Sequence, residues 1–118
     1  MPIVTVLGVP ETASDLTLSR LFHDIKREIA SVEELGLTEK QVSVFFPRDL
    51  GESTRCSFNS NEVCVLIAIY AKPERSDEVI HRMAERLQKR LKNNYFQDSL
   101  VEVLPQMLDP KHCSSSAT

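Results

Sequence analysis

Residues 4–16, VTVLGVPETASDL, and residues 67–79, IAIYAKPERSDEV, follow one pattern that decides the fold. In each stretch, alternating apolar residues lead to a proline–glutamate pair, and a Ser-Asp pair then opens a run with helical spacing. Further along, VSVFFPRDL from Val42 has a counterpart in VEVLPQML from Val101. The 118-residue chain therefore contains two copies of a strand–helix–strand unit, which start 63 positions apart (67 minus 4).

Each copy carries the start and stop signals of one helix. The first helix is predicted to begin near Ser14 or Asp15, with Ser14 as its N-cap, and Gly36 is its stop signal. The second is predicted to start at Ser76, followed by acidic residues that suit the positive end of a helix dipole. The apolar stripes comprise Leu18, Leu21, Phe22, Ile25, Ile29 and Val32 in the first helix, and Val79, Ile80, Met83, Ala84, Leu87 and Leu91 in the second.

A helix that links two strands gives a βαβ unit with parallel pairing and a right-handed crossover. Two units predict an α/β (α+β) fold, a tandem βαβ repeat with a four-stranded sheet that carries both helices on one face. Residues 63–71, VCVLIAIYA, are apolar at nearly every position, which indicates burial on both faces of the sheet. Because two helices cover only one face, the other face predicts a homo-oligomer.

The repeats define one domain over residues 1–109, with repeat one at 2–50 and repeat two at 63–109. The polar stretch between them, RDLGESTRCSFNSNE, is predicted to be a loop that could include a short hairpin. The tail, residues 110–118, is predicted to be disordered.

Composition excludes several classes of partner. A net charge of −3 gives no reason to expect nucleic acid or an anionic membrane. No apolar run approaches the length of a bilayer span, and the first residues lack the features of a signal peptide, so cytoplasmic residence is expected. Three cysteines without CxxC spacing and three histidines without ligand spacing predict neither a disulfide framework, a metal site nor a cofactor.

The opening Met1-Pro2 has two interpretations. A proline without a backbone N–H is tolerated as the first residue of a strand. If Met1 is removed, however, Pro2 becomes a secondary amine that can accept a proton, since an α-amino group titrates near ~7.7–8.0. The sequence leaves open whether the removal occurs.

The duplicated βαβ unit, the Met-Pro start and the need for an oligomer resemble the tautomerase superfamily, whose members include 4-oxalocrotonate tautomerase and macrophage migration inhibitory factor. The resemblance covers residues 2–108, and short uncharacterised bacterial members match as well as any named enzyme. It implies a homotrimer in which Pro2 is the catalytic base. The motif RSDE at residues 75–78 implies that Arg75 contacts a substrate carboxylate.

The physical argument for Arg75 does not depend on the family. A guanidinium can hold a carboxylate through two parallel hydrogen bonds, and the N-terminus of a helix adds backbone N–H groups. The alternative is an exposed arginine that bonds the acidic residues just after it. The sequence also departs from the family pattern at positions where other members carry a basic residue: Thr12, Leu37, Ser43 and Glu102.

Further side chains could contribute to such a site. Lys72, at the end of the strand before Arg75, could add positive potential near Pro2. Glu102 could act as a general acid or orient a water, or it could be a carboxylate at an edge or subunit seam. Arg48 and Arg55, in the long loop, could reach a neighbouring protomer's site.

These observations predict a tautomerase or isomerase that transfers a proton between keto and enol forms of a small carboxylate-bearing carbonyl compound. The alternative is a non-catalytic trimer that keeps the fold. A third reading is a ferredoxin-like sensor or RNA-binding module, which antiparallel strand order would favour and parallel βαβ pairs would exclude.

Overall fold

The computed structural model describes residues 2–10, 12–47 and 62–114. Its strands are β1 (Ile3–Leu7), β2 (Ser43–Phe45), β3 (Glu62–Tyr70) and β4 (Leu100–Leu108). Its α-helices are α1 (Asp15–Ala30) and α2 (Asp77–Asn94), and three short 3-10 helices are η1 (Glu33–Leu35), η2 (Glu39–Gln41) and η4 (Pro110–His112). The predicted loop of residues 48–61, with Arg48 and Arg55, lies outside the described residues.

The four strands form one sheet in the order β2-β1-β3-β4. Within each repeat the strands are parallel: β1 pairs with β2, and β3 pairs with β4. The two repeats meet at β1 and β3, which are antiparallel, with Val4 opposite Ile67. Parallel pairs joined by a helix confirm the predicted tandem βαβ architecture and exclude the ferredoxin-like reading.

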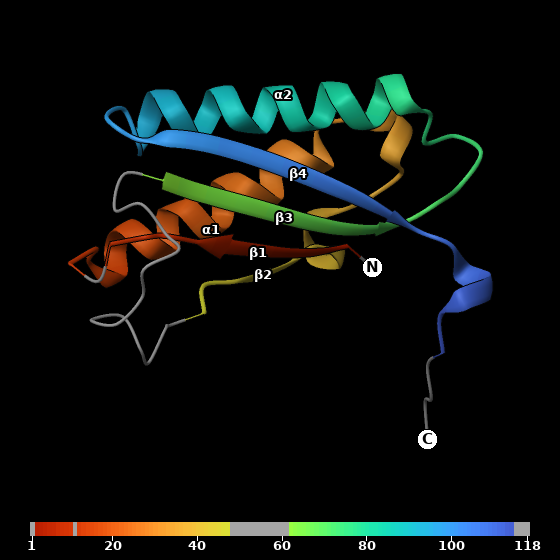
Figure 1. Ribbon diagram of the computed structural model, residues 1–118, viewed down its shortest axis with the longest axis horizontal. Coiled ribbons are helices and arrows are strands. Elements are labelled where there is room, and N and C mark those ends of the chain that lie inside the picture. Colours follow the sequence, from red (N-terminus) through yellow and green to blue (C-terminus); the bar gives the residue numbers. More distant parts are fainter. Residues whose placement is uncertain (1, 11, 48–61, 115–118) are drawn as a thin grey trace.

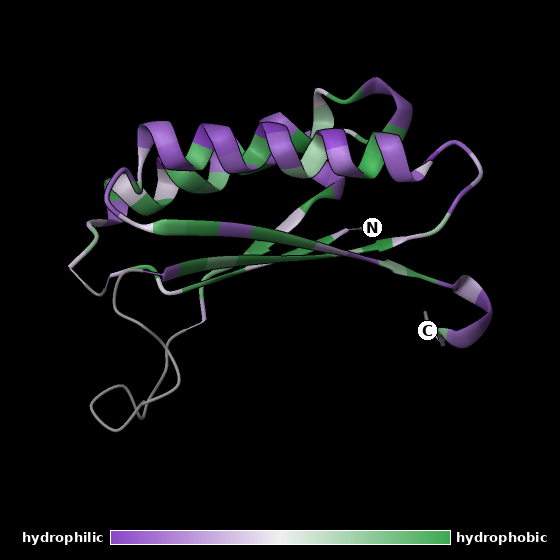
Figure 2. Cartoon of the chain, turned by 45° about the horizontal axis from the view of Figure 1, so that its top comes forward, coloured by the Kyte–Doolittle hydropathy of each residue, from purple (hydrophilic) through white to green (hydrophobic). Residues whose placement is uncertain are grey.

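Both helices pack on the same face of the sheet, as Figure 1 shows, and turn their hydrophobic sides toward it (Figure 2). Each begins where predicted, because a serine hydroxyl accepts a hydrogen bond from a backbone N–H one turn ahead. Ser14 Oγ accepts from Thr17 N at 3.1 Å, and Ser76 Oγ accepts from Val79 N at 3.3 Å. The core between the layers includes Val4, Val6, Leu21, Ile25, Ile29, Val63, Val65, Ile67, Ile69, Met83, Leu87 and Leu91.

Two predicted boundaries differ from the structure. Helix α1 ends at Ala30, and Gly36 instead closes the short helix η1, where its φ of +67° places it in the left-handed region and its N–H bonds Glu33 O. The stretch predicted to be a disordered tail begins with η4, because the Asp109 side chain accepts from Lys111 N at 2.9 Å. Residues 115–118 lie outside the described part of the chain.

Gly8 follows the end of β1 and lies very close to the backbone at the start of β3. Its φ is +89°, and a Cβ at this position would lie 2.2 Å from the carbonyl oxygen of Glu62. Only glycine fits there, because any side chain would collide with the neighbouring backbone.

None of the described helices covers the other face of the sheet, which we call the open face. It carries exposed large apolar side chains on all four strands: Ile3 is 44% exposed, Phe45 55%, Leu66 39%, Leu100 55% and Leu104 47%. Their positions follow from the register, since Leu66 is paired with both Thr5 and Leu104. The central strand β3 is therefore buried on its helix face and half-exposed on this open face.

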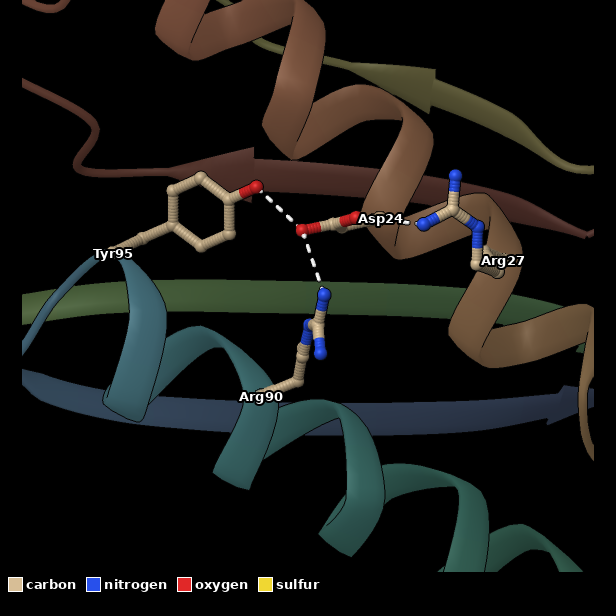
Figure 3. Close-up of polar contacts among 4 residues, drawn as sticks. All are labelled: Asp24, Arg27, Arg90 and Tyr95. Atoms are coloured by element: carbon tan, nitrogen blue, oxygen red, sulfur yellow. Dashed lines mark hydrogen bonds and ion pairs between the residues drawn. The ribbon is translucent and has the colours of Figure 1, made fainter.

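A polar cluster ties the end of α2 to α1 (Figure 3). The Tyr95 hydroxyl donates a hydrogen bond of 2.5 Å to Asp24 Oδ2, which also accepts from Arg90 at 3.4 Å. Burial, reinforced by the hydrogen bond to Asp24 and by its charge, raises the pKa of Tyr95 to about 12. The neutral phenol is therefore the form that the folded protein favours.

The Tyr95→Phe variant should lower the free energy of unfolding by about 1–2 kcal/mol at neutral pH, because Asp24 loses a donor. The folded pKa lies above the unfolded value of ~10, so this stabilisation is complete below pH ~10 and is lost as pH rises toward 12. Urea unfolding across this range should show a smaller alkaline loss in Tyr95→Phe than in the wild type. Tyr70→Phe is the matched control. An equal loss of stability in both variants would contradict a stabilising role for the hydrogen bond from Tyr95 to Asp24.

Candidate active site

Pro2 lies at the start of β1 and is buried. Its carbonyl accepts a hydrogen bond of 3.1 Å from Ser43 N, the first residue of β2. The next residue, Ile3, pairs with Ser43 on one side and with Ala68 on the other. Pro2 therefore lies between β2 and β3 at the end of the sheet where β1 and β2 begin and where β3 and β4 end, and we call its surroundings the Pro2 corner.

Arg75 is 4% exposed and lies just beyond the end of β3, next to the Pro2 corner. Its Nη1 donates to Tyr70 O at 2.7 Å, while Nε and Nη2 donate to Leu35 O at 3.2 and 2.9 Å. The guanidinium thus holds two backbone carbonyls of its own chain. Among the described residues, it makes no hydrogen bond to the acidic residues that follow it. The alternative of an exposed arginine bonded to those residues is therefore wrong.

Lys72 is exposed in the turn between β3 and α2. The turn is held by Arg75 N, which donates to Lys72 O at 2.9 Å, and by Ala71 N, which donates to Leu108 O at 2.8 Å. Lys72 therefore belongs to the same end of the sheet as Pro2, at its solvent-facing side.

Glu102 is exposed and points away from the helix layer, as its alternation with Val101 predicts. It pairs with Cys64, which pairs in turn with Leu7 at the far end of β1. Cys64 and Ala68 are four positions apart on β3, a distance of about 13 Å at the rise of an extended strand. One protomer thus keeps Glu102 away from its own Pro2. Burial, followed by the charges of Glu102 and Glu62, raises the pKa of the Cys64 thiol.

The positions where the sequence departs from the family pattern are spread over the molecule. Ser43 is adjacent to Pro2 through the backbone hydrogen bond, Leu37 packs against the core, and Thr12 is exposed. Of these, Ser43 is the one that bonds Pro2 directly. The carbonyl groups of Leu35 and Tyr70, which accept hydrogen bonds from Arg75, could not be found from the sequence, because backbone atoms carry no residue signature.

Two kinds of feature are absent from the described residues. None of their helices combines the length and apolar character needed to cross a bilayer. They also contain no group of three or more His, Cys, Asp or Glu side chains arranged to hold a metal ion.

Two parallel βαβ units joined by antiparallel central strands are the fold that this chain shares with solved structures such as fused 4-OT and a macrophage migration inhibitory factor. No family model and no curated protein matches the sequence. Solved structures do match over nearly the whole chain, at sequence identities that establish the fold alone.

Three of these structures show the degree of similarity. A domain of unknown function (DUF1904) from Sebaldella termitidis has a TM-score of 0.70 and 12% identity, covering 100% of this chain and 98% of its own. Native fused 4-OT has a TM-score of 0.70 and 14% identity, covering 98% and 94%. Macrophage migration inhibitory factor from Toxoplasma gondii has a TM-score of 0.60 and 13% identity, covering 99% and 96%.

Proposed function

We propose that this chain, after removal of Met1, is a tautomerase in which Pro2 is the catalytic base. The observation that carries the proposal is the position of Pro2 at the buried corner of a fold shared with fused 4-OT and macrophage migration inhibitory factor. The substrate class is a small carbonyl compound that bears a carboxylate.

In the proposed reaction, the neutral amine of Pro2 takes a proton from the carbon beside the carbonyl. The electron pair of that C–H bond forms a C=C bond, and the π pair of the carbonyl moves onto its oxygen to give the enolate. The protonated amine then returns the proton to this oxygen, two atoms away, which gives the enol and regenerates the base. The reaction requires the neutral form of the Pro2 amine as its base.

We expect the positive charge that binds the substrate carboxylate to come from side chains at the end of the sheet where Pro2 lies. Lys72 is exposed there and can supply an ammonium group, and Arg75 adds positive potential from its buried position. Glu102 of one protomer could reach the Pro2 corner of another as a general acid, which fits its exposure on the open face.

The oligomer is proposed to be a homotrimer. Fused 4-OT proteins of the same fold have been described as symmetric and asymmetric trimers. The apolar open face of this chain, with Phe45, Leu66 and Leu104 exposed, supports burial against further copies of the chain.

Intact-mass measurement of the purified protein, followed by an enol–keto assay with phenylenolpyruvate, tests the proposal. The expected result is a mass that lacks Met1 and turnover that rises with pH as the amine loses its proton. Processed protein that gives no turnover of such compounds would contradict it.

The second candidate is a non-catalytic trimer with the same fold. The hydrogen bonding of Arg75 to backbone carbonyls favours it, because that arginine is then occupied within its own protomer. A protein that retains Met1 quantitatively would fit this candidate, since its Pro2 nitrogen would be an amide.

A further inference from the structure

Arg75 is the one charged side chain that is buried among the described residues. Removing a cation from water is costly unless hydrogen bonds compensate for the lost hydration. Three of its five N–H groups are compensated by the carbonyls of Leu35 and Tyr70. Burial still lowers the pKa of the guanidinium, while the charge of Glu74 acts in the opposite direction.

The two carbonyls belong to different repeats. Leu35 is the last residue of η1 and is itself buried, and Tyr70 is the last residue of β3. Leu35 and Arg75 are 40 positions apart, so this side chain joins the end of the first repeat's helical segment to the central strand of the second.

Both anchor points adjoin the Pro2 corner. Tyr70 lies two residues beyond Ala68, which pairs with Ile3 next to Pro2. The segment from Leu35 leads through η2 to Ser43, whose N–H bonds the carbonyl of Pro2. The guanidinium therefore links the end of β3 to the start of the segment that leads into β2.

We propose that Arg75 is a positioning residue, which fixes β3 and the approach to β2 around Pro2 through backbone carbonyls instead of holding the substrate carboxylate. This inference rests on the proposed function for its catalytic consequence, but the structural link can be tested without turnover. A planar guanidinium suits the role because its rigid fork can donate in two directions, whereas an ammonium is a single point of charge.

The test compares Arg75→Met and Arg75→Lys with Arg86→Met, the same substitution at an exposed arginine on α2. Hydrogen exchange is measured at the amides of Gly36 and Ala71, beside the two anchor carbonyls. Arg75→Met should speed exchange at both amides by on the order of 10-fold and lower the thermal midpoint by at least ~5 °C. Arg75→Lys should restore little of the amide protection or of the thermal midpoint, and Arg86→Met should change neither quantity.

Turnover separates positioning from carboxylate binding. With phenylenolpyruvate and its methyl ester as substrates, positioning predicts that Arg75→Met lowers kcat/KM for both by a similar factor, on the order of 10- to 100-fold, mainly through kcat. Carboxylate binding instead predicts a loss confined to the acid and expressed in KM, with rescue by Arg75→Lys. That second pattern would overturn the proposal.

The two proposals fail in different ways. If the processed wild type turns over neither substrate, the proposed function fails, and hydrogen exchange and the thermal midpoint still decide the role of Arg75. If Arg75→Met leaves both of these unchanged, the positioning role fails whatever the activity.

Discussion

Blocking the nitrogen of Pro2 is expected to lower the tautomerase kcat/KM by at least ~100-fold, the usual contribution of a positioned general base. The sharpest variant keeps Pro2 and leaves one residue attached before it. The ring and the start of β1 are then unchanged, but the nitrogen is an amide that cannot accept a proton near neutral pH. Activity is measured with phenylenolpyruvate, and intact mass verifies the terminus.

Pro2→Ala gives the companion measurement. Alanine in place of proline still exposes an amine after Met1 is removed, but a primary amine on a flexible residue, so the loss should be severe and yet smaller than for the extended chain. Unfolding of both variants should stay close to that of the wild type. Full turnover in the extended chain would remove Pro2 from the mechanism.

Placing a charge on the open face is expected to dissociate the oligomer. Leu66 lies on the central strand β3, is 39% exposed in the protomer, and is paired with Leu104 on β4. Leu66→Glu would bury a carboxylate in an apolar interface, which is unfavourable without a partner. Light scattering should show the mass falling from three times the chain mass of 13.4 kDa to the chain mass itself.

Leu16→Glu is the matched control, since Leu16 is also an exposed leucine but lies on α1 in the helix layer. If Leu66→Glu fails to fold, Phe45→Glu on the edge strand β2 tests the same face with less disturbance of the sheet. A wild type that is monomeric at micromolar concentration, or a Leu66→Glu variant that keeps its mass, would refute the open face as an interface.

The local elements of the fold were predictable because their causes are local. Serine caps at Ser14 and Ser76 and the apolar stripe of α2 need only a few neighbouring residues, and the structure confirms each. Gly36 was assigned to the wrong helix, because a left-handed glycine ends a 3-10 turn as readily as an α-helix. The antiparallel contact of β1 with β3 was not predicted, since it depends on how two complete repeats pack.

The candidate site was predictable only in part. The sequence drew attention to Pro2 and Arg75, and the fold brings both to one end of the sheet. It could not give the partners of Arg75, because Leu35 contributes a carbonyl from 40 positions away and any residue type has one. The separation of Glu102 from Pro2 likewise follows from the strand register, which no single stretch encodes.

Because β1 and β3 are antiparallel, the first strand of the second repeat begins at the opposite end of the sheet from Pro2, at Glu62. A polypeptide has one amino terminus, so only one of these equivalent positions can ever expose a chain-end nitrogen, and the other is a continuous backbone. Duplication has therefore left the second repeat without a base of its own, and its part in the proposed chemistry is limited to side chains such as Lys72 and Arg75 at the end of the sheet where Pro2 lies.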